Sequence, residues 1–208
     1  MMNIDLRTID TKNAYKLMTG SIVPRPIAWV STVDEQGNRN LAPFSFFTVA
    51  SRNPPTLCIS VGPGVGEREG TTKDTLANIL NTKQFVVNIV SSDLGDEMHT
   101  SSTNFPQEVD EFAAAGLTPV DSVHVQAPRV GEAPISFELE LDQIIELGSD
   151  HLVLGKVVQY HIQDEYYLGN YKVDLEKLKP LGRLAGNYSE ANKLFTLPRV
   201  KVEEGVNR

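Results

Sequence analysis

The stretch ISFELELDQIIELGSDHLVLGKVVQYHI, residues 135–162, decides the fold class. In its first half Phe137, Leu139 and Leu141 alternate with polar residues, among them Ser136 and Glu138. Successive side chains of a β-strand point to opposite faces, so this period of two predicts a strand with one apolar face and one face in water. Sheets with one solvated face are usually antiparallel. We therefore expect an antiparallel sheet with Glu138 on its solvated face.

Six apolar runs have the length and composition of strands, at residues 26–33, 41–51, 55–61, 84–90, 135–147 and 151–162. The turn-rich segment DEQGNRN joins the first two runs, which predicts a hairpin. Short accessory helices are expected at about residues 11–18, 74–81, 94–99 and 109–115. Six strands with few helices between them fit a mainly β protein whose sheet forms a closed or nearly closed barrel, because closure removes exposed edges.

A chain of 208 residues suits one domain, and we expect residues 1–208 to form it. From about Tyr166 the sequence becomes polar and contains several glycines. This composition is typical of an extended arm, which we place at residues 166–208. Its apolar residues need a surface to cover, and a neighbouring subunit would supply one; they are Leu178, Leu181, Leu184 and Tyr188.

The formal net charge of −8 makes binding to nucleic acid or to an anionic membrane surface a poor fit. No apolar run approaches the ~20 residues that span a bilayer, and the N-terminus lacks the apolar stretch of a signal peptide, so we expect a cytoplasmic protein. Cys58 is the single cysteine and lies in an apolar run, which favours a core thiol over a nucleophile. No metal site is expected, because His99, His124 and His161 have no ligand partners at suitable spacing.

The segment GTTKDTLANIL, residues 70–80, has the features of an anion site. Leu76, Ile79 and Leu80 predict a helix that packs one face on the barrel and begins near Asp74, with Thr72 or Asp74 as N-cap. Free N–H groups at the helix start, nearby threonine hydroxyls and the charge of Lys73 would together suit a phosphate monoester. The same residues also fit ordinary helix caps beside a solvated lysine, so both interpretations remain open.

The predicted hairpin places small polar residues beside aromatic ones. A flat heteroaromatic ring needs hydrogen-bond partners at its edge and apolar surface at its faces, and this hairpin offers both. The three phenylalanines also fit a plain core role. The residues concerned are Ser31, Thr32, Asn40, Ala42, Pro43 and Ser45, with Phe44, Phe46 and Phe47.

Four motifs in this order and spacing resemble a known family. They are PRPIAWVST (24–32), NLAPFSFFTVAS (40–51), NPPTLCISVG (53–62) and KDTLANI (73–79). The chain resembles the flavin reductase-like FMN-binding split-barrel proteins, which include flavoredoxin and the reductase components of two-component monooxygenases. The resemblance runs from about Ile4 to Leu197. It implies a six-stranded split barrel with Greek-key features, a homodimer, and FMN held noncovalently near the dimer interface.

The resemblance also implies a set of cofactor contacts. The isoalloxazine edge would meet Ser31, Thr32 and the backbone around Val30. The ring and ribityl chain would lie against Asn40, Ala42, Ser45 and Phe46, and the phosphate would be held by Ser60, Lys73, Asp74 and Thr75. Asp74 would act through its backbone N–H, because its carboxylate repels phosphate. Arg25 is a further candidate for charge near the cofactor. His151 matches a family position on the nicotinamide side of the flavin, and it equally fits a histidine bonded to backbone.

These features lead to one hypothesis and two alternatives. The first is an oxidoreductase that passes hydride from NADH or NADPH to flavin and onward to an acceptor, such as a monooxygenase or another electron-transfer partner. The flavin would supply the redox chemistry, so no nucleophile or acid–base pair is needed. The second is a non-enzymatic, FMN-holding electron carrier that a protein partner reduces. The third is a barrel of the same fold that binds no flavin.

Overall fold

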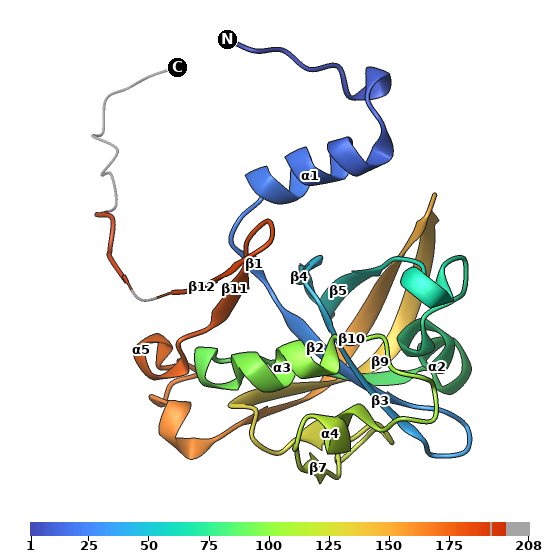
Figure 1. The fold of residues 1–208 in the computed structure, drawn as a ribbon. Coiled ribbons are helices and arrows are strands. Elements are labelled where there is room, and N and C mark those ends of the chain that lie inside the picture. The colour runs from blue at the N-terminus through green and yellow to red at the C-terminus, as the bar shows by residue number, and fades with distance from the viewer. Residues whose placement is uncertain (192, 199–208) are drawn as a thin grey trace.

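The computed structural model describes residues 1–191 and 193–198. Within these residues the main feature is an antiparallel sheet of seven strands, in the order β3-β2-β6-β9-β10-β5-β4 (Figure 1). Its strands are β2 (Ala28–Val33), β3 (Arg39–Phe44), β4 (Phe47–Arg52), β5 (Pro55–Val61), β6 (Gln84–Ile89), β9 (Ile135–Leu147) and β10 (Asp150–Ile162). All six predicted runs form strands, and the prediction of a mainly β, antiparallel fold is confirmed.

The two edge strands of this sheet, β3 and β4, follow one another directly in the chain. Only Ser45 and Phe46 separate them. Strand β3 pairs with β2, whereas β4 pairs with β5 at the other edge of the sheet. Two residues span only about 7 Å, so the sheet must curl until its edges meet at this corner. The result is a split barrel, and the six predicted strands become seven because the run at 41–51 bends at Ser45–Phe46.

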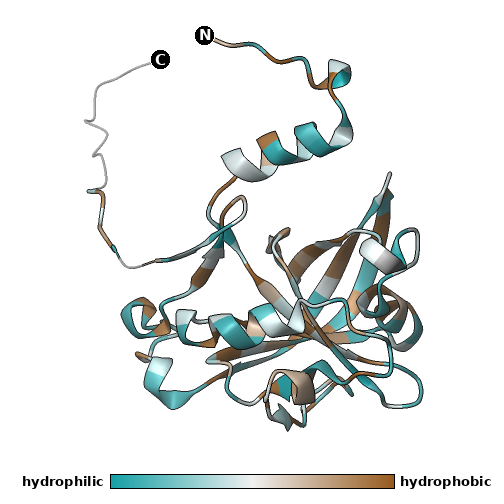
Figure 2. Ribbon diagram, viewed as in Figure 1, coloured by the Kyte–Doolittle hydropathy of each residue, from teal (hydrophilic) through white to brown (hydrophobic). Residues whose placement is uncertain are grey.

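Apolar side chains fill the inside of the barrel, and Figure 2 shows hydrophobic residues concentrated along its strands. Val30, Leu139 and Val153 are among the residues buried there. The packing is close at Gly155 in β10, where an added Cβ would lie 2.5 Å from Cζ of Phe85. The phenylalanine ring therefore occupies the space that any larger residue at position 155 would need.

A second apolar cluster lies outside the barrel, against β2 and β3. Trp29 and Leu41 point to this side and pack with Met98 and Phe112. The indole of Trp29 donates a 2.8 Å hydrogen bond to Ser101 Oγ. These contacts place α3 (Gly95–Ser101) and α4 (Glu111–Ala114) against the outer side of β2 and β3.

The other helices are short, as expected. They are α1 (Thr11–Ser21), α2 (Asp74–Thr82) and α5 (Leu175–Leu178), with 3-10 turns η1 (Leu6–Thr8), η2 (Gly66–Arg68), η3 (Ser92–Leu94) and η4 (Asp164–Tyr166). The four predicted helices correspond to α1, α2, α3 and α4. Helix α1 projects away from the barrel (Figure 1), and of its residues Thr19 alone is buried.

The expectation that Glu138 faces water is wrong. Its side chain has no exposed surface. The carboxylate accepts hydrogen bonds from the backbone N–H groups of residues 123–125 and lies 2.6 Å from Nε2 of His161. A loop that connects the small strands β7 (Pro119–Val120) and β8 (Arg129–Val130) therefore covers this face of the sheet. Burial by itself would raise the pKa of Glu138, but these donors outweigh burial and lower it.

The interpretation of residues 166–208 as an extended arm is wrong for the part up to residue 190. Leu178 is only 5% exposed, and the N–H of Leu181 donates to the carbonyl of Val90. Strand β11 (Leu181–Arg183) pairs with β1 (Arg25–Pro26) and with β12 (Tyr188–Glu190). Leu178 thus finds cover on its own chain, which short-range sequence patterns do not reveal, whereas Leu181 and Leu184 are half-buried and Tyr188 stays exposed. Residues 192 and 199–208 of the predicted arm lie outside the described residues.

Three further expectations concern features elsewhere in the chain. Within the described part, no helix combines the length and apolar composition needed to cross a bilayer. The same residues contain no group of three His, Cys, Asp or Glu side chains that could hold a metal ion. Cys58 is half-buried rather than fully buried in β5, and burial raises the pKa of its thiol, which disfavours a nucleophilic thiolate.

Candidate functional site

The start of α2 offers uncapped backbone donors. The helix begins at Asp74, and its N-cap is Lys73, whose side chain accepts no hydrogen bond. The expectation that Thr72 or Asp74 caps the helix is therefore wrong. No described side chain bonds to the N–H groups of the first turn, so these groups remain available to a ligand, together with the partial positive charge of the helix N-terminus.

The ammonium group of Lys73 lies at this same point. It is half-buried, and its Nζ lies 5.5 Å from the centre of the Phe44 ring. Among the described side chains no carboxylate comes within ion-pair distance of it. Burial lowers the pKa of Lys73, the charge of Arg68 lowers it further, and Asp150 opposes both. A half-buried ammonium without a counterion is the arrangement that an anionic ligand would stabilise.

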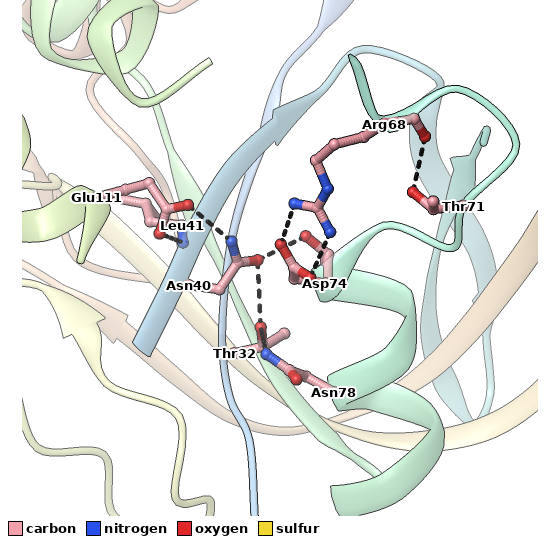
Figure 3. A network of polar contacts seen from close by, with 9 residues as sticks. Thr32, Asn40, Leu41, Arg68, Thr71, Asp74, Asn78 and Glu111 are labelled. Carbon is pink, nitrogen blue, oxygen red and sulfur yellow. Dashed lines mark hydrogen bonds and ion pairs between the residues drawn. The ribbon is translucent and has the colours of Figure 1, made fainter. Parts of the chain in front are cut away.

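Arg68 is a second cation at this site, and the sequence analysis did not identify it. Its guanidinium forms a bidentate ion pair with the Asp74 carboxylate, with one contact at 2.7 Å (Figure 3). Asp74 is thereby neutralised, which leaves the charge of Lys73 in excess. The signal was present in the segment GEREG, residues 66–70, where an arginine follows a glycine-rich turn. Gly64 is required here, because an added Cβ would collide with the carbonyl oxygen of Arg68.

A buried polar network fixes Asn40 on the wall opposite α2 (Figure 3). Asn40 Oδ1 accepts a 2.8 Å hydrogen bond from the Thr75 hydroxyl, and Asn40 Nδ2 donates to Glu111 Oε1 at 3.0 Å. Thr32 joins the network through Asn78 Nδ2, which donates to its hydroxyl at 3.0 Å. The second N–H of the Asn40 amide has no partner among the described residues.

Glu111 is another residue that the sequence analysis missed. It accepts hydrogen bonds from Asn40 Nδ2 and from the N–H of Leu41. Burial raises the pKa of Glu111, and these donors only partly offset the effect. Glu111 lies 71 residues from Asn40 in the sequence, so no local pattern could have paired them.

These groups line one open cleft of about 580 Å³, a volume that includes space open to solvent. It brings together five of the predicted cofactor contacts, Asn40, Ala42, Lys73, Asp74 and Thr75. The rest of its lining is Pro43, Gly64, Val65, Arg68, Glu111 and the segment 101–105. One end of the cleft is therefore cationic, and the other wall is formed by the small and polar residues of β3.

Other predicted contacts do not line this cleft. Val30 lies in the barrel core, and the Ser31 hydroxyl is fully buried, where it donates to the Pro128 carbonyl. Thr32 is buried within the polar network. Ser60 lies beside Asp150, with 3.5 Å between its Oγ and Oδ1. His151 pairs with Val61 across β5 and β10.

Ser45 and Phe46 line another open pocket between α1 and β4, of about 920 Å³ including space open to solvent. Arg25 also lines it, but its guanidinium is already bonded to carbonyl oxygens of Thr19, Ile22 and Leu184. Arg25 therefore anchors α1 and the C-terminal segment to the barrel, and it has little capacity left to bind a ligand anion.

Comparison with known proteins identifies the family to which this fold belongs. A model of the flavin reductase like domain matches residues 19–178. The chain is 43% identical to an uncharacterized protein from Aquifex aeolicus (strain VF5) over 187 residues, which are 90% of this chain and 94% of the relative. The chain therefore belongs to the flavin reductase-like family, as its motifs predicted.

Two solved structures extend the comparison. Nitrilotriacetate monooxygenase component B from Bacillus cereus is 35% identical, with a TM-score of 0.89 over 95% of this chain and 98% of that one. The 2-nitrobenzoate 2-nitroreductase from Pseudomonas fluorescens is 30% identical, with a TM-score of 0.85 over 100% and 99% of the two chains. Both likenesses extend over essentially the whole molecule.

Proposed function

We propose that the protein is an FMN-dependent oxidoreductase of the flavin reductase type, which passes a hydride from NADH or NADPH to flavin and the electrons onward to an acceptor. One observation carries the proposal. Lys73, a half-buried cation without a described counterion, lies at the uncapped start of α2 in the same cleft as the fixed amide of Asn40. Membership of the flavin reductase-like family supports flavin as the ligand.

The donor set at the cationic end fits the phosphate of FMN. The Lys73 ammonium and the free N–H groups of α2 would both contact a phosphate, and Arg68 could share its guanidinium between that phosphate and Asp74. Riboflavin has no phosphate and would leave these donors unused. The site therefore favours FMN over riboflavin.

The other residues of the cleft would orient the ring system. Asn40 is held in one orientation by Thr75 and Glu111, so its remaining N–H is a fixed donor for a carbonyl or ring nitrogen. Ala42 is small enough to let a flat ring lie close to β3. FMN, when bound, accepts and releases the hydride, so the chain need only bind it, orient it and exclude water. No role is assigned to His151, which lies outside the cleft lining.

Steady-state oxidation of NADH and NADPH in the presence of FMN tests this proposal. We expect at least one nucleotide to be oxidised at a rate that depends on both the protein and FMN. If the protein binds FMN but oxidises neither nucleotide, the reductase proposal is wrong and the electron-carrier alternative replaces it. The name of component B, a monooxygenase component, supports a monooxygenase or another electron-transfer protein as the acceptor.

We also propose that the protein is a homodimer. Helix α1 exposes Tyr15 at 52% and Met18 at 48%, Ile22 directly after the helix is 66% exposed, and the edge strand β4 exposes Val49 at 66%. The 920 Å³ cavity lies between these two elements. A second copy would cover both surfaces and complete the pairing of an edge strand. Light scattering should return about twice the chain mass of 22.9 kDa, and a value near the chain mass would contradict the proposal.

A further inference from the structure

A second cavity, the Arg183 cavity, adjoins the candidate cleft. It is an open pocket of about 500 Å³, a volume that includes space open to solvent, and its lining includes Arg183, Tyr188 and His99. It shares Pro43 and Ser102 with the cleft assigned to FMN. A molecule in the Arg183 cavity would therefore lie directly beside a flavin in that cleft.

The C-terminal hairpin of β11 and β12 brings Arg183 to this position. Arg183 lies opposite Arg25 where β11 pairs with β1. Two cations that face each other across a strand pair repel one another unless an anion or a set of acceptors compensates them. Arg25 has carbonyl acceptors on three sides. Arg183, among the described residues, has neither an ion pair nor a side-chain hydrogen bond.

One aromatic ring, that of Tyr188, lies against the uncompensated guanidinium. The guanidinium carbon of Arg183 lies 4.5 Å from the centre of the Tyr188 ring. The Tyr188 ring meets the His99 imidazole edge-on, with 6.4 Å between centres. Stacking on Tyr188 holds the guanidinium flat while its N–H groups remain free. A planar fork of this kind matches the oxygens of a phosphate or a carboxylate.

We propose that the Arg183 cavity binds the oxyanion of the second substrate, the molecule that exchanges electrons with the flavin. This inference rests on the proposed function and deepens it. Arg183 binds the oxyanion, Tyr188 positions the guanidinium, and His99 lines the same cavity beside Tyr188. The oxyanion is a phosphate if the ligand is a pyridine dinucleotide, and a carboxylate if it is an organic acid acceptor.

Isothermal titration calorimetry of Arg183→Ala tests the proposal, with NADP⁺ and benzoate as separate probes and with FMN present or absent. We expect wild-type protein to bind at least one probe and Arg183→Ala to bind it about tenfold to a hundredfold more weakly. Arg183→Lys should fall between the two, because it keeps the charge and loses the fork. Lys172→Ala, which removes one charge from an exposed turn, is the matched control and should bind like wild type.

Three results would overturn the proposal: no binding of either probe by wild type, equal binding by wild type and Arg183→Ala, or an equal loss in Lys172→Ala. A parallel loss of FMN affinity in Arg183→Ala would also overturn it, because Arg183 would then act on the flavin cleft or on the fold. Binding of NADP⁺ that depends on Arg183 identifies the phosphate source, and binding of benzoate identifies the carboxylate source. If probe binding depends on Arg183 but no nucleotide is oxidised, the Arg183 site stands and the reductase function fails.

Discussion

Replacement of Lys73 by alanine should weaken FMN binding and leave riboflavin binding unchanged. A phosphate monoester carries close to two negative charges at pH 7, and its charge-assisted contact with an ammonium group contributes about 1.5–3 kcal/mol. The contribution of the α2 N-terminus, about 0.3–1 kcal/mol, persists in the variant because the N–H groups remain. Lys73 has no described ion pair to lose, and the loss of its contact with the Phe44 ring is common to both titrations, so the difference between FMN and riboflavin measures the phosphate contact. We expect FMN affinity to fall about tenfold to a hundredfold.

Titrations that follow the quenching of flavin fluorescence measure both ligands in the same way. Lys172→Ala serves as the charge-matched control and should bind both ligands like wild type. Equal weakening of FMN and riboflavin by Lys73→Ala would show that Lys73 acts on the ring or on folding, and the placement of the phosphate would be wrong. If neither affinity changes, Lys73 is an ordinary surface charge.

The pH dependence of FMN affinity supplies another test. Only protonated Lys73 attracts phosphate, so FMN affinity should fall as pH rises through the pKa of Lys73, and because that pKa is lowered the fall should come at lower pH than for an ordinary lysine. Lys73→Arg should remove the fall, because arginine stays protonated. Glu138→Ala leaves three backbone N–H groups without acceptors, so urea unfolding should show a loss of about 3 kcal/mol or more. Because the pKa of Glu138 is lower in the folded state, its contribution to stability is present above the unfolded pKa and is lost as pH falls through the folded pKa. Glu138→Ala should therefore lose less stability on acidification than wild type. Identical acid unfolding profiles of the two proteins would contradict this. Gly155→Ala should lower the free energy of unfolding by about 1–3 kcal/mol, because its Cβ would collide with Phe85, and an unchanged value would show that the barrel interior is looser than described.

The fold could be predicted from the sequence wherever the signal was local. Alternation and β-branched residues mark each strand of the barrel, and the spacing of Leu76 and Ile79 marks α2. The misplacement of Glu138 shows the limit of this reasoning. Alternation identifies a polar position, but it cannot tell whether water or the amides of residues 123–125 will meet the carboxylate. The polar C-terminal segment was misjudged for the same reason, since Leu178 is buried by contacts distant in sequence.

Some residues of the candidate site could be predicted from local sequence, and others could not. Lys73 could be proposed from the short segment around it, because a lysine, threonines and a helix start are adjacent in the chain. Glu111 could not be proposed, because it approaches Asn40 only after α4 packs against β3. Arg183 reaches its cavity through the pairing of β11 with β1, which joins segments more than 150 residues apart. Residues that act through tertiary contacts require the structure.

Titration of the purified protein with FMN decides whether the cleft beside α2 is a flavin site. We expect saturable quenching of FMN fluorescence at micromolar concentrations, with one FMN bound per chain. An absence of quenching at those concentrations would contradict the proposed function and would leave a barrel of this family that binds no flavin.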